Sequence, residues 1–275
     1  MCAHMFQPAN VLLFLQLRKF FVVFFAYLLI FLYFCTVKAQ IMAIGNVTPD
    51  SFYAKSRLSN KDEIIFWAKS SLEHGADILD IGGCSTRPGS VPADLETEWN
   101  RVEPTLEIIR ENFPHASLSL DTFRPEIARR AIEKFGKMII NDISGGEEQM
   151  YDLVRDLDVP YIWTLRGDLE LPKKNPQLCD MDLILDPGLG FIGSVEGDYD
   201  CLRHLDDLRE YGFPVLVGLS RKSMIYKALG LMPDTCLTPT QALQLYALDH
   251  GATILRTHDV AATRDIVTLY ELLNK

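Results

Sequence analysis

Short apolar runs alternate with longer amphipathic stretches from residue 41 to the end of the chain. The first run, IMAI at residues 41–44, leads into the polar stretch GNVTPDSF. Residues 61–74 then place apolar side chains three or four positions apart, which is the spacing of one helix face. Because a short apolar run bounded by turn residues is typical of a buried strand, this pattern predicts a strand, a polar loop and a helix.

The same pattern recurs along the rest of the chain. The expected strands lie in IMAI, DILDIGG, SLSLDT, MIINDISGG, YIWTLRG, LILDPGLGF, PVLVGLSRKS and TILRTHDV. The expected helices lie near residues 61–74, 95–112, 125–135, 147–157, 199–211, 223–229, 239–250 and 264–273. Eight strands that alternate with helices predict an α/β fold, a (β/α)8 TIM barrel. A doubly wound open sheet is the alternative.

The repeat between the fifth and sixth strands is too short for an ordinary crossover helix. Residues 168–182 read DLELPKKNPQLCDMD and contain Pro172 and Pro176. Proline interrupts a helix, and a parallel crossover needs about a dozen residues or more. We therefore expect the helix after strand five to be missing or reduced to a turn.

The N-terminal part of the chain has a different composition. Residues 20–37 form a run of 18 without a charged side chain, preceded by Arg18 and Lys19 and followed by Lys38. This length is near the lower limit for a membrane-spanning helix, and a basic start before an apolar run also fits a signal peptide. A third interpretation is a start placed too far upstream, so that the segment is not part of the natural protein.

We therefore expect two parts, an apolar N-terminal helix within residues 1–38 and a barrel over residues 39–275. Any membrane contact would involve residues 20–37. Basic residues are slightly more numerous after this run than before it. This excess favours a cytoplasmic barrel that is tethered by the N-terminal segment.

The charge balance limits the partners. The chain has 27 Lys and Arg against 37 Asp and Glu, so its formal net charge is −10. This balance excludes a general nucleic-acid-binding surface but leaves room for a local basic cluster that binds a small anion. The six cysteines are scattered and form no C-x-x-C pair. They indicate free thiols in a reducing cytosol rather than a disulfide framework or a zinc site.

Polar side chains collect where the expected strands end. Seven of the eight ends carry an ionisable or amide group: Asn46, Arg87, Asp121, Asn141 with Asp142, Asp186, Arg221 with Lys222, and Arg256 with His258. Active sites of such barrels lie at the carboxyl ends of the strands. A polar turn explains any single case, but the recurrence predicts a functional rim.

Two chemical sets can be separated within this rim. Asp121, Asn141 and Asp186 offer carboxylate and amide groups that suit the donor and acceptor edge of a heterocycle. A cationic set suits a phosphate or a carboxylate and consists of Arg87, Arg221, Lys222, Arg256 and His258. Asp121 alone would also fit a helix N-cap, and Arg221 with Lys222 a solvated pair. Cys84 is disfavoured as a nucleophile because no histidine follows it nearby.

Taken together, the strand-end stretches resemble dihydropteroate synthase, an enzyme of folate synthesis. The matching motifs are GNVTPDSF, DIGGCSTRPG, LDT, INDISGG, LDPGLGF, GLSRKSM and LRTHDV, and they span residues 41–260. The pterin-binding domain of methyltetrahydrofolate methyltransferases shares the barrel but usually not the SRKS motif. The resemblance is therefore to the synthase.

The resemblance implies condensation of 6-hydroxymethyl-7,8-dihydropterin pyrophosphate with p-aminobenzoate, with Mg²⁺ as cofactor and a homodimer as the common assembly. It implies catalytic roles for Lys222, Arg256 and Asp121. The implied pterin residues are Asp121, Asn141, Asp186 and Lys222. Those implied for pyrophosphate and Mg²⁺ are Asn46, Arg256 and His258, with Asn46 nearest the metal. Those implied for p-aminobenzoate are Thr86, Arg87, Pro88, Phe191, Lys222 and Ser223.

Four features depart from the family pattern, and one of them is the largely missing fifth helix at residues 168–182. Cys84 stands where the family often has Glu, and the apolar segment replaces a short polar hairpin. The family's Met-His-Met run corresponds to Trp163, Thr164 and Leu165, so we expect Trp163 to fill or block the pterin pocket. Trp163 and the missing fifth helix keep open a non-catalytic pterin-binding paralogue, which could be membrane-anchored. A methyltransferase with a corrinoid partner is a minor alternative.

Overall fold

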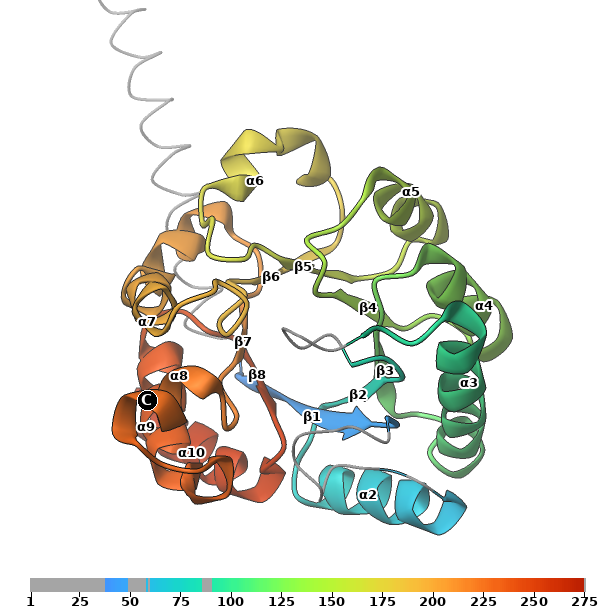
Figure 1. Cartoon of the computed structure of the whole chain (residues 1–275), viewed down its shortest axis with the longest axis horizontal. Helices are drawn as coiled ribbons and strands as arrows, with labels where there is room; N and C mark the ends of the chain where they lie inside the picture. The colour runs from blue at the N-terminus through green and yellow to red at the C-terminus, as the bar shows by residue number, and fades with distance from the viewer. Residues whose placement is uncertain (1–37, 49–57, 59, 86–90, 275) are drawn as a thin grey trace, which may run out of the picture. The chain divides into compact units, whose positions relative to one another are not determined.

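The computed structural model describes residues 38–48, 58, 60–85 and 91–274. In this part of the chain, eight parallel strands surround a common axis and helices cover their outer side (Figure 1). The strands are β1 Gln40–Asn46, β2 Ile78–Gly82, β3 Ser117–Asp121, β4 Ile139–Asp142, β5 Tyr161–Thr164, β6 Leu183–Asp186, β7 Leu216–Gly218 and β8 Ile254–Thr257. The predicted barrel is confirmed, and the open-sheet alternative is wrong.

The helices follow the strands in the expected order. They are α2 Lys61–Glu73, α3 Leu95–Asn112, α4 Pro125–Phe135, α5 Glu148–Leu157, α6 Leu171–Lys174, α7 Val195–Arg203, α8 Ser223–Leu229, α9 Leu237–Asp249 and α10 Val260–Leu273. The helix expected near 199–211 instead begins at Val195, because the Ser194 side chain caps it by accepting a bond from the Gly197 amide. Its predicted second half is the 3-10 helix η3, Leu205–Tyr211.

The shortened fifth repeat is confirmed. Between β5 and β6 the chain forms only α6, which has four residues, and the three-residue 3-10 helix η2, Pro176–Leu178. Each of these pieces begins with a proline in its first turn, where the missing amide hydrogen is tolerated.

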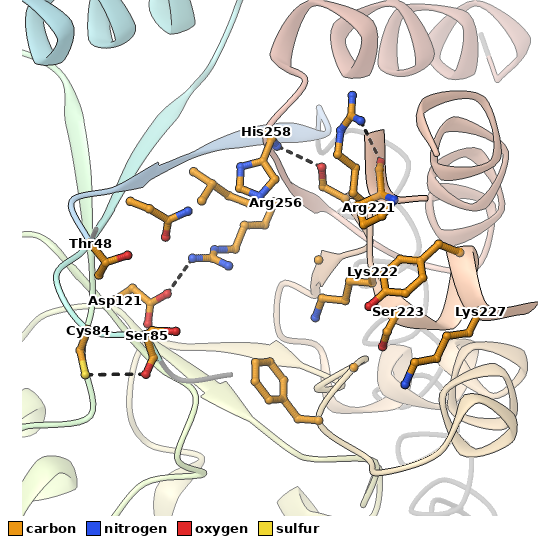
Figure 2. Close-up of a pocket in the computed structure, with 18 residues that line it drawn as sticks. Thr48, Cys84, Ser85, Asp121, Arg221, Lys222, Ser223, Lys227, Arg256 and His258 are labelled. Carbon is orange, nitrogen blue, oxygen red and sulfur yellow. Dashed lines mark hydrogen bonds and ion pairs between the residues drawn. The ribbon is translucent and has the colours of Figure 1, made fainter. Parts of the chain in front are cut away.

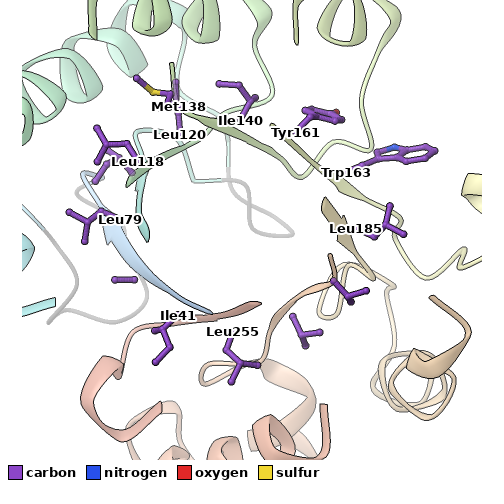
Figure 3. Packing of buried hydrophobic residues seen from close by; sticks show 14 of the residues in the cluster. Ile41, Leu79, Leu118, Leu120, Met138, Ile140, Tyr161, Trp163, Leu185 and Leu255 are labelled. Atoms are coloured by element: carbon purple, nitrogen blue, oxygen red, sulfur yellow. The ribbon is translucent and has the colours of Figure 1, made fainter. Parts of the chain in front are cut away.

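Alternate residues of each strand face the barrel interior and the helices. An inner apolar cluster contains Met42, Ile78, Ile162, Ile184, Leu216 and Ile254. A larger outer cluster lies between the strands and the helices, and Figure 3 shows part of it, including Ile41, Leu79, Tyr161, Trp163 and Leu255. Since the strands are apolar on both faces, hydrophobicity alone does not reveal which residues point inward.

Trp163 belongs to the outer cluster, so the expectation that it fills the pterin pocket is wrong. Its indole Nε1 donates to the Gly145 carbonyl at 2.8 Å, and its ring meets that of Tyr151 edge-on at 6.4 Å. The neighbours of Trp163 on β5, Ile162 and Thr164, therefore face the barrel interior. Trp163 fixes the loop after β4 from outside the barrel.

Several predictions lie outside the described residues. They concern the apolar segment 20–37, Cys2, Cys35 and the loop 86–90. The division into residues 1–38 and 39–275 stays a prediction. Among the described residues, no helix combines the length and apolar character that a membrane crossing requires. The four cysteines in this part are free thiols, as expected: Cys84, Cys179, Cys201 and Cys236.

Candidate functional site

The carboxyl ends of the first four strands lie at one level of the barrel. Asn46 on β1 pairs with Gly82 on β2, Gly82 with Asp121 on β3, and Asp121 with Asn141 on β4. Because residues paired across neighbouring strands share a face of the sheet, these side chains point together into the barrel. Three of the predicted polar strand ends, Asn46, Asp121 and Asn141, therefore lie in one layer.

A cavity of about 470 Å³ opens above this layer (Figure 2). Eight of the predicted residues line it: Asn46, Asp121, Phe191, Arg221, Lys222, Ser223, Arg256 and His258. Cys84 and Ser85 contribute to the same wall. Asn141 and Asp186 are not lining residues and lie buried on β4 and β6. Thr86, Arg87 and Pro88 lie outside the described residues.

Arg256 is held by two carboxylates. Its Nη2 atom lies 2.6 Å from Asp80 Oδ2 and 2.7 Å from Asp121 Oδ2, and its Nε donates to Asp80 Oδ2 at 2.7 Å. Burial opposes the Arg256 charge, but Asp80 and Asp121 outweigh that effect and raise its pKa. The three groups together carry a net charge of −1 when all are ionised, so Arg256 is not a simple anion site.

The sequence pattern does not indicate Asp80 as a site residue, because Asp80 lies inside the strand run DILDIGG rather than at its end. It is fully buried. A signal was present, since Asp80 precedes Gly82 by two residues and therefore faces the same side of the strand.

Asp121 does not cap a helix. The cap position of α4 is Arg124, and Asp121 instead faces Arg256. Burial raises the pKa of the Asp121 carboxyl to about 7, while Arg256 opposes the shift and Asp80 adds to it. Asp121 is therefore a carboxyl group that changes its charge near neutral pH.

Lys222 is a half-buried cation that lines the cavity. Its Nζ donates to the Leu189 carbonyl and lies 4.9 Å from the centre of the Phe191 ring. Burial lowers the Lys222 pKa, and nearby Asp186 partly offsets this effect. Burial likewise raises the Asp186 pKa, and Lys222 opposes the rise. The ammonium is thus poorly solvated and available to a polar ligand.

Arg221 lies on the cavity wall, but its guanidinium is committed to structural contacts. Nε and Nη2 each donate at 2.9 Å to one oxygen of Asp259, and Nη1 donates at 2.9 Å to the Pro233 and Asp234 carbonyls. In Figure 2 the Arg221 and Lys222 side chains leave the loop in different directions. The contact with Asp259 reduces the charge that Arg221 can offer to an anion, and its place in the cationic phosphate-binding set stays a prediction.

Four buried polar atoms on β3, β4 and β5 have no hydrogen-bond partner in the described part of the chain: Ser119 Oγ, Asp121 Oδ1, Asn141 Oδ1 and Thr164 Oγ1. Thr164 is fully buried and pairs with Asp186 across β5 and β6. Buried polar groups are normally satisfied, so a cluster of unsatisfied ones suggests partners that a ligand or water provides.

The sequence and the fold were compared with known proteins. A family model described as "Pterin binding enzyme" matches residues 42–176 and 177–258. The dihydropteroate synthase of Streptococcus pyogenes serotype M3 is 35% identical over 256 residues, covering 86% of this chain and 96% of that protein. The dihydropteroate synthase of Haemophilus influenzae is 34% identical over 257 residues, covering 84% and 93% respectively.

Solved structures with a similar fold are also dihydropteroate synthases. Xanthomonas albilineans dihydropteroate synthase with 4-aminobenzoic acid has a TM-score of 0.77 and 35% identity, and the match covers 86% of this chain and 93% of that one. A dihydropteroate synthase from Coxiella burnetii in complex with pteroic acid has a TM-score of 0.78 and 30% identity, with coverages of 86% and 94%.

Proposed function

This chain belongs to the pterin-binding enzyme family, and on that premise we propose that it is a dihydropteroate synthase. The reaction is the condensation of 6-hydroxymethyl-7,8-dihydropterin pyrophosphate with p-aminobenzoate. The products are 7,8-dihydropteroate and pyrophosphate, and the pathway is folate biosynthesis. The observation that carries the proposal is the set of buried acceptor atoms beneath the cavity that lack partners among the described residues, together with the half-buried Lys222 on the cavity wall.

We assign the pterin to Asp121, Asn141, Asp186 and Lys222. Asp121 Oδ1 and Asn141 Oδ1 are buried acceptors without partners among the described residues. A 2-amino-4-oxo pteridine presents N–H donors along one edge and a carbonyl acceptor, which suits these oxygens together with the Lys222 ammonium. Binding would complete bonds that the free protein leaves open.

We assign the pyrophosphate and its Mg²⁺ to Asn46, Arg256 and His258. In the described part of the chain, no group of three His, Cys, Asp or Glu side chains is placed to hold a metal. Mg²⁺ does not need one, because it commonly binds one or two protein oxygens, several waters and the phosphates of the substrate. The Asn46 carboxamide on the cavity wall fits that pattern. Bound Mg²⁺ would neutralise charge on the departing pyrophosphate.

The same cavity wall suits p-aminobenzoate. Phe191 and Ser223 line it beside Lys222, so an aromatic face, a hydroxyl and a cation lie together. We also assign Thr86, Arg87 and Pro88 to this substrate on the family motif, although they lie outside the described residues.

In the proposed mechanism the protein positions the substrates and stabilises their charges, and none of its side chains forms a covalent bond with them. The C–O bond to pyrophosphate breaks, positive charge develops on the pterin methylene, and the neutral arylamine forms the new C–N bond without a strong general base. The proton that the nitrogen then loses passes to the departing pyrophosphate or to water. The carboxylates Asp121 and Asp186 favour that positive charge, and Lys222 orients the ring between them and Phe191. Asn141 and Asp186 are buried beneath the cavity, and we propose that a bound pterin on them is kept away from bulk water.

The non-catalytic paralogue loses its main support, because Trp163 faces the helices rather than the pterin residues. Its remaining support is the shortened fifth repeat, which lies outside the cavity lining. The two alternatives differ in turnover, since a paralogue binds the pterin without forming product.

The test supplies the full chain with Mg²⁺, pterin pyrophosphate and labelled p-aminobenzoate and follows labelled dihydropteroate. We expect product from the wild type and a loss of at least about a hundredfold in kcat/KM for Lys222→Ala, because a half-buried charged partner of the substrate is removed. Arg203→Ala, a change at an exposed cation outside the cavity, is the matched control. Pterin binding by the wild type without product would establish the paralogue instead.

Assembly and location are separate proposals. We propose a homodimer, as is common in this family, which a molar mass measured by light scattering would test. We also propose a cytoplasmic barrel with membrane contact through residues 20–37, on the strength of their uncharged sequence. Release of the full chain from membranes by carbonate would refute the membrane-spanning anchor.

A further inference from the structure

Asp80 is a carboxylate that solvent does not reach, in the middle of the otherwise apolar strand β2. It pairs with Ile44 on β1 and Ser119 on β3, one level below the layer that carries Asp121. Asp80 does not line the cavity. An ionised carboxylate is unfavourable in such a place unless its partners compensate for lost hydration, so those partners indicate its role.

The first partner is Arg256. Asp80 Oδ2 accepts a hydrogen bond from Nε of the guanidinium and forms an ion pair with its Nη2. Asp121 Oδ2 accepts a hydrogen bond from the same Nη2. A planar guanidinium that is held at two of its nitrogens cannot rotate freely. Asp80 thereby sets the plane in which Arg256 reaches Asp121 and the cavity.

The second partner is Asn141. Its Nδ2 atom lies 3.3 Å from Asp80 Oδ2 and 3.5 Å from Asp80 Oδ1. These contacts are long, but in both of them Asn141 is the donor and Asp80 the acceptor. A carboxylate only accepts hydrogen bonds, so it favours the amide orientation in which Nδ2 faces Asp80. Asn141 Oδ1 then remains as a buried acceptor, like Asp121 Oδ1.

We propose that Asp80 is a positioning residue that orients the Asn141 carboxamide and the Arg256 guanidinium, so that Asn141 and Asp121 offer acceptor oxygens to the same edge of the ligand. Asp80 itself does not touch the substrate. The inference rests on the proposed pterin-binding function and deepens it, because it predicts that the site prefers a pteridine with an amino group at position 2.

The experiment compares two probes, 6-hydroxymethyl-7,8-dihydropterin pyrophosphate and the analogue in which a 2-oxo group replaces the 2-amino group. Calorimetry gives Kd for both probes with the full-length wild type and with Asp80→Asn. In the variant, the carboxamide oxygen takes the Oδ2 position that faces the donor-only Arg256, and the NH2 group takes the Oδ1 position, 3.5 Å from Asn141 Nδ2. Asn141 Nδ2 then meets one acceptor and one donor instead of two acceptors, so the Asn141 amide is no longer held in one orientation and can present Nδ2 to the ligand.

We expect the preference of the wild type for the 2-amino probe to fall at least about tenfold in Asp80→Asn, the size of one reversed hydrogen bond. Asp142→Asn is the matched control. Asp142 is equally buried but accepts from Tyr161 Oη on the outer side of the barrel, so its loss should leave the preference unchanged. Thermal denaturation shows whether each variant is folded.

Equal weakening of both probes in folded Asp80→Asn, or no weakening, would overturn the inference and leave Asp80 as a counter-charge only. If that variant does not fold, the exchange Asp80→Asn with Asn141→Asp restores the carboxylate and the ligand-facing acceptor, and we expect the preference to return. A folded exchange variant without the preference would also overturn the inference. A wild type that binds neither probe would refute the proposed function itself.

Discussion

Replacing Arg221 with methionine tests whether this cation supports the fold or binds phosphate. The guanidinium makes two bonds to Asp259 and two to backbone carbonyls, and the two charged side chains are 8% and 17% exposed. Removing one partner of a buried ion pair costs about 3–5 kcal/mol. Since water can still reach part of Asp259, we expect a loss near the lower limit, about 3 kcal/mol.

The assay is thermal denaturation of the full chain at neutral pH, with pyrophosphate affinity measured well below the transition. For a domain of this size about 3 kcal/mol corresponds to a fall in Tm of roughly 6–12 °C. We expect the Kd for pyrophosphate to change less than about threefold, because Asp259 already neutralises the guanidinium. Arg203→Met, at an exposed ion pair, is the control and should change stability by about 0.5 kcal/mol or less.

The opposite pattern would refute this reasoning. If Arg221→Met keeps the Tm of the wild type but weakens pyrophosphate binding more than about tenfold, Arg221 is a phosphate ligand after all. The contact with Asp259 would then be a resting position that the substrate displaces.

Two further predictions concern the interior of the barrel. Thr164→Val should raise the free energy of unfolding by about 1 kcal/mol, because it removes a buried hydroxyl that has no partner among the described residues, and it should also weaken pterin binding. A lower stability in thermal denaturation, or an unchanged pterin affinity in calorimetry, would contradict this prediction. Pterin affinity should rise with pH up to about 7 and then level off, because the carboxyl of Asp121, whose pKa is raised to about 7, must lose its proton to accept from the ligand. Titrations from pH 5.5 to pH 8.5 would measure this profile, and Asp121→Asn should flatten it; affinity that falls over the same range would disprove the assignment.

The barrel could be predicted from the sequence because each repeat is a local signal. Strand runs, helix periodicity and prolines within residues 168–182 all act over a few positions. It is harder to predict from the sequence which face of a strand each side chain occupies. In YIWT every residue is buried, so hydrophobicity does not separate the two faces, and a shift of one residue exchanges Trp163 with Thr164.

Long-range partners explain what the sequence could not indicate about Arg221 and Asp80. Arg221 resembles a ligand-binding cation until the fold brings Asp259, 38 residues later in the chain, to its guanidinium. Asp80 lies in a strand run and acquires its role only when β4 and β8 place Asn141 and Arg256 beside it. Local pattern predicts where polar groups collect, but the pairing among them depends on the closed barrel.

The closure of the barrel has a dynamic consequence. Strands β6 and β7 join through a single bridge, Leu185 to Val215, whereas every other neighbouring pair shares at least three paired residues. Local opening of the barrel between β6 and β7, which we call the seam, therefore breaks fewer backbone hydrogen bonds than opening between any other neighbouring pair of strands. Asp186 ends β6, and Lys222 reaches from the loop after β7 to the Leu189 carbonyl on the other side. A ligand held by both residues would span the seam, so binding energy and barrel closure are coupled at the point where the sheet is weakest.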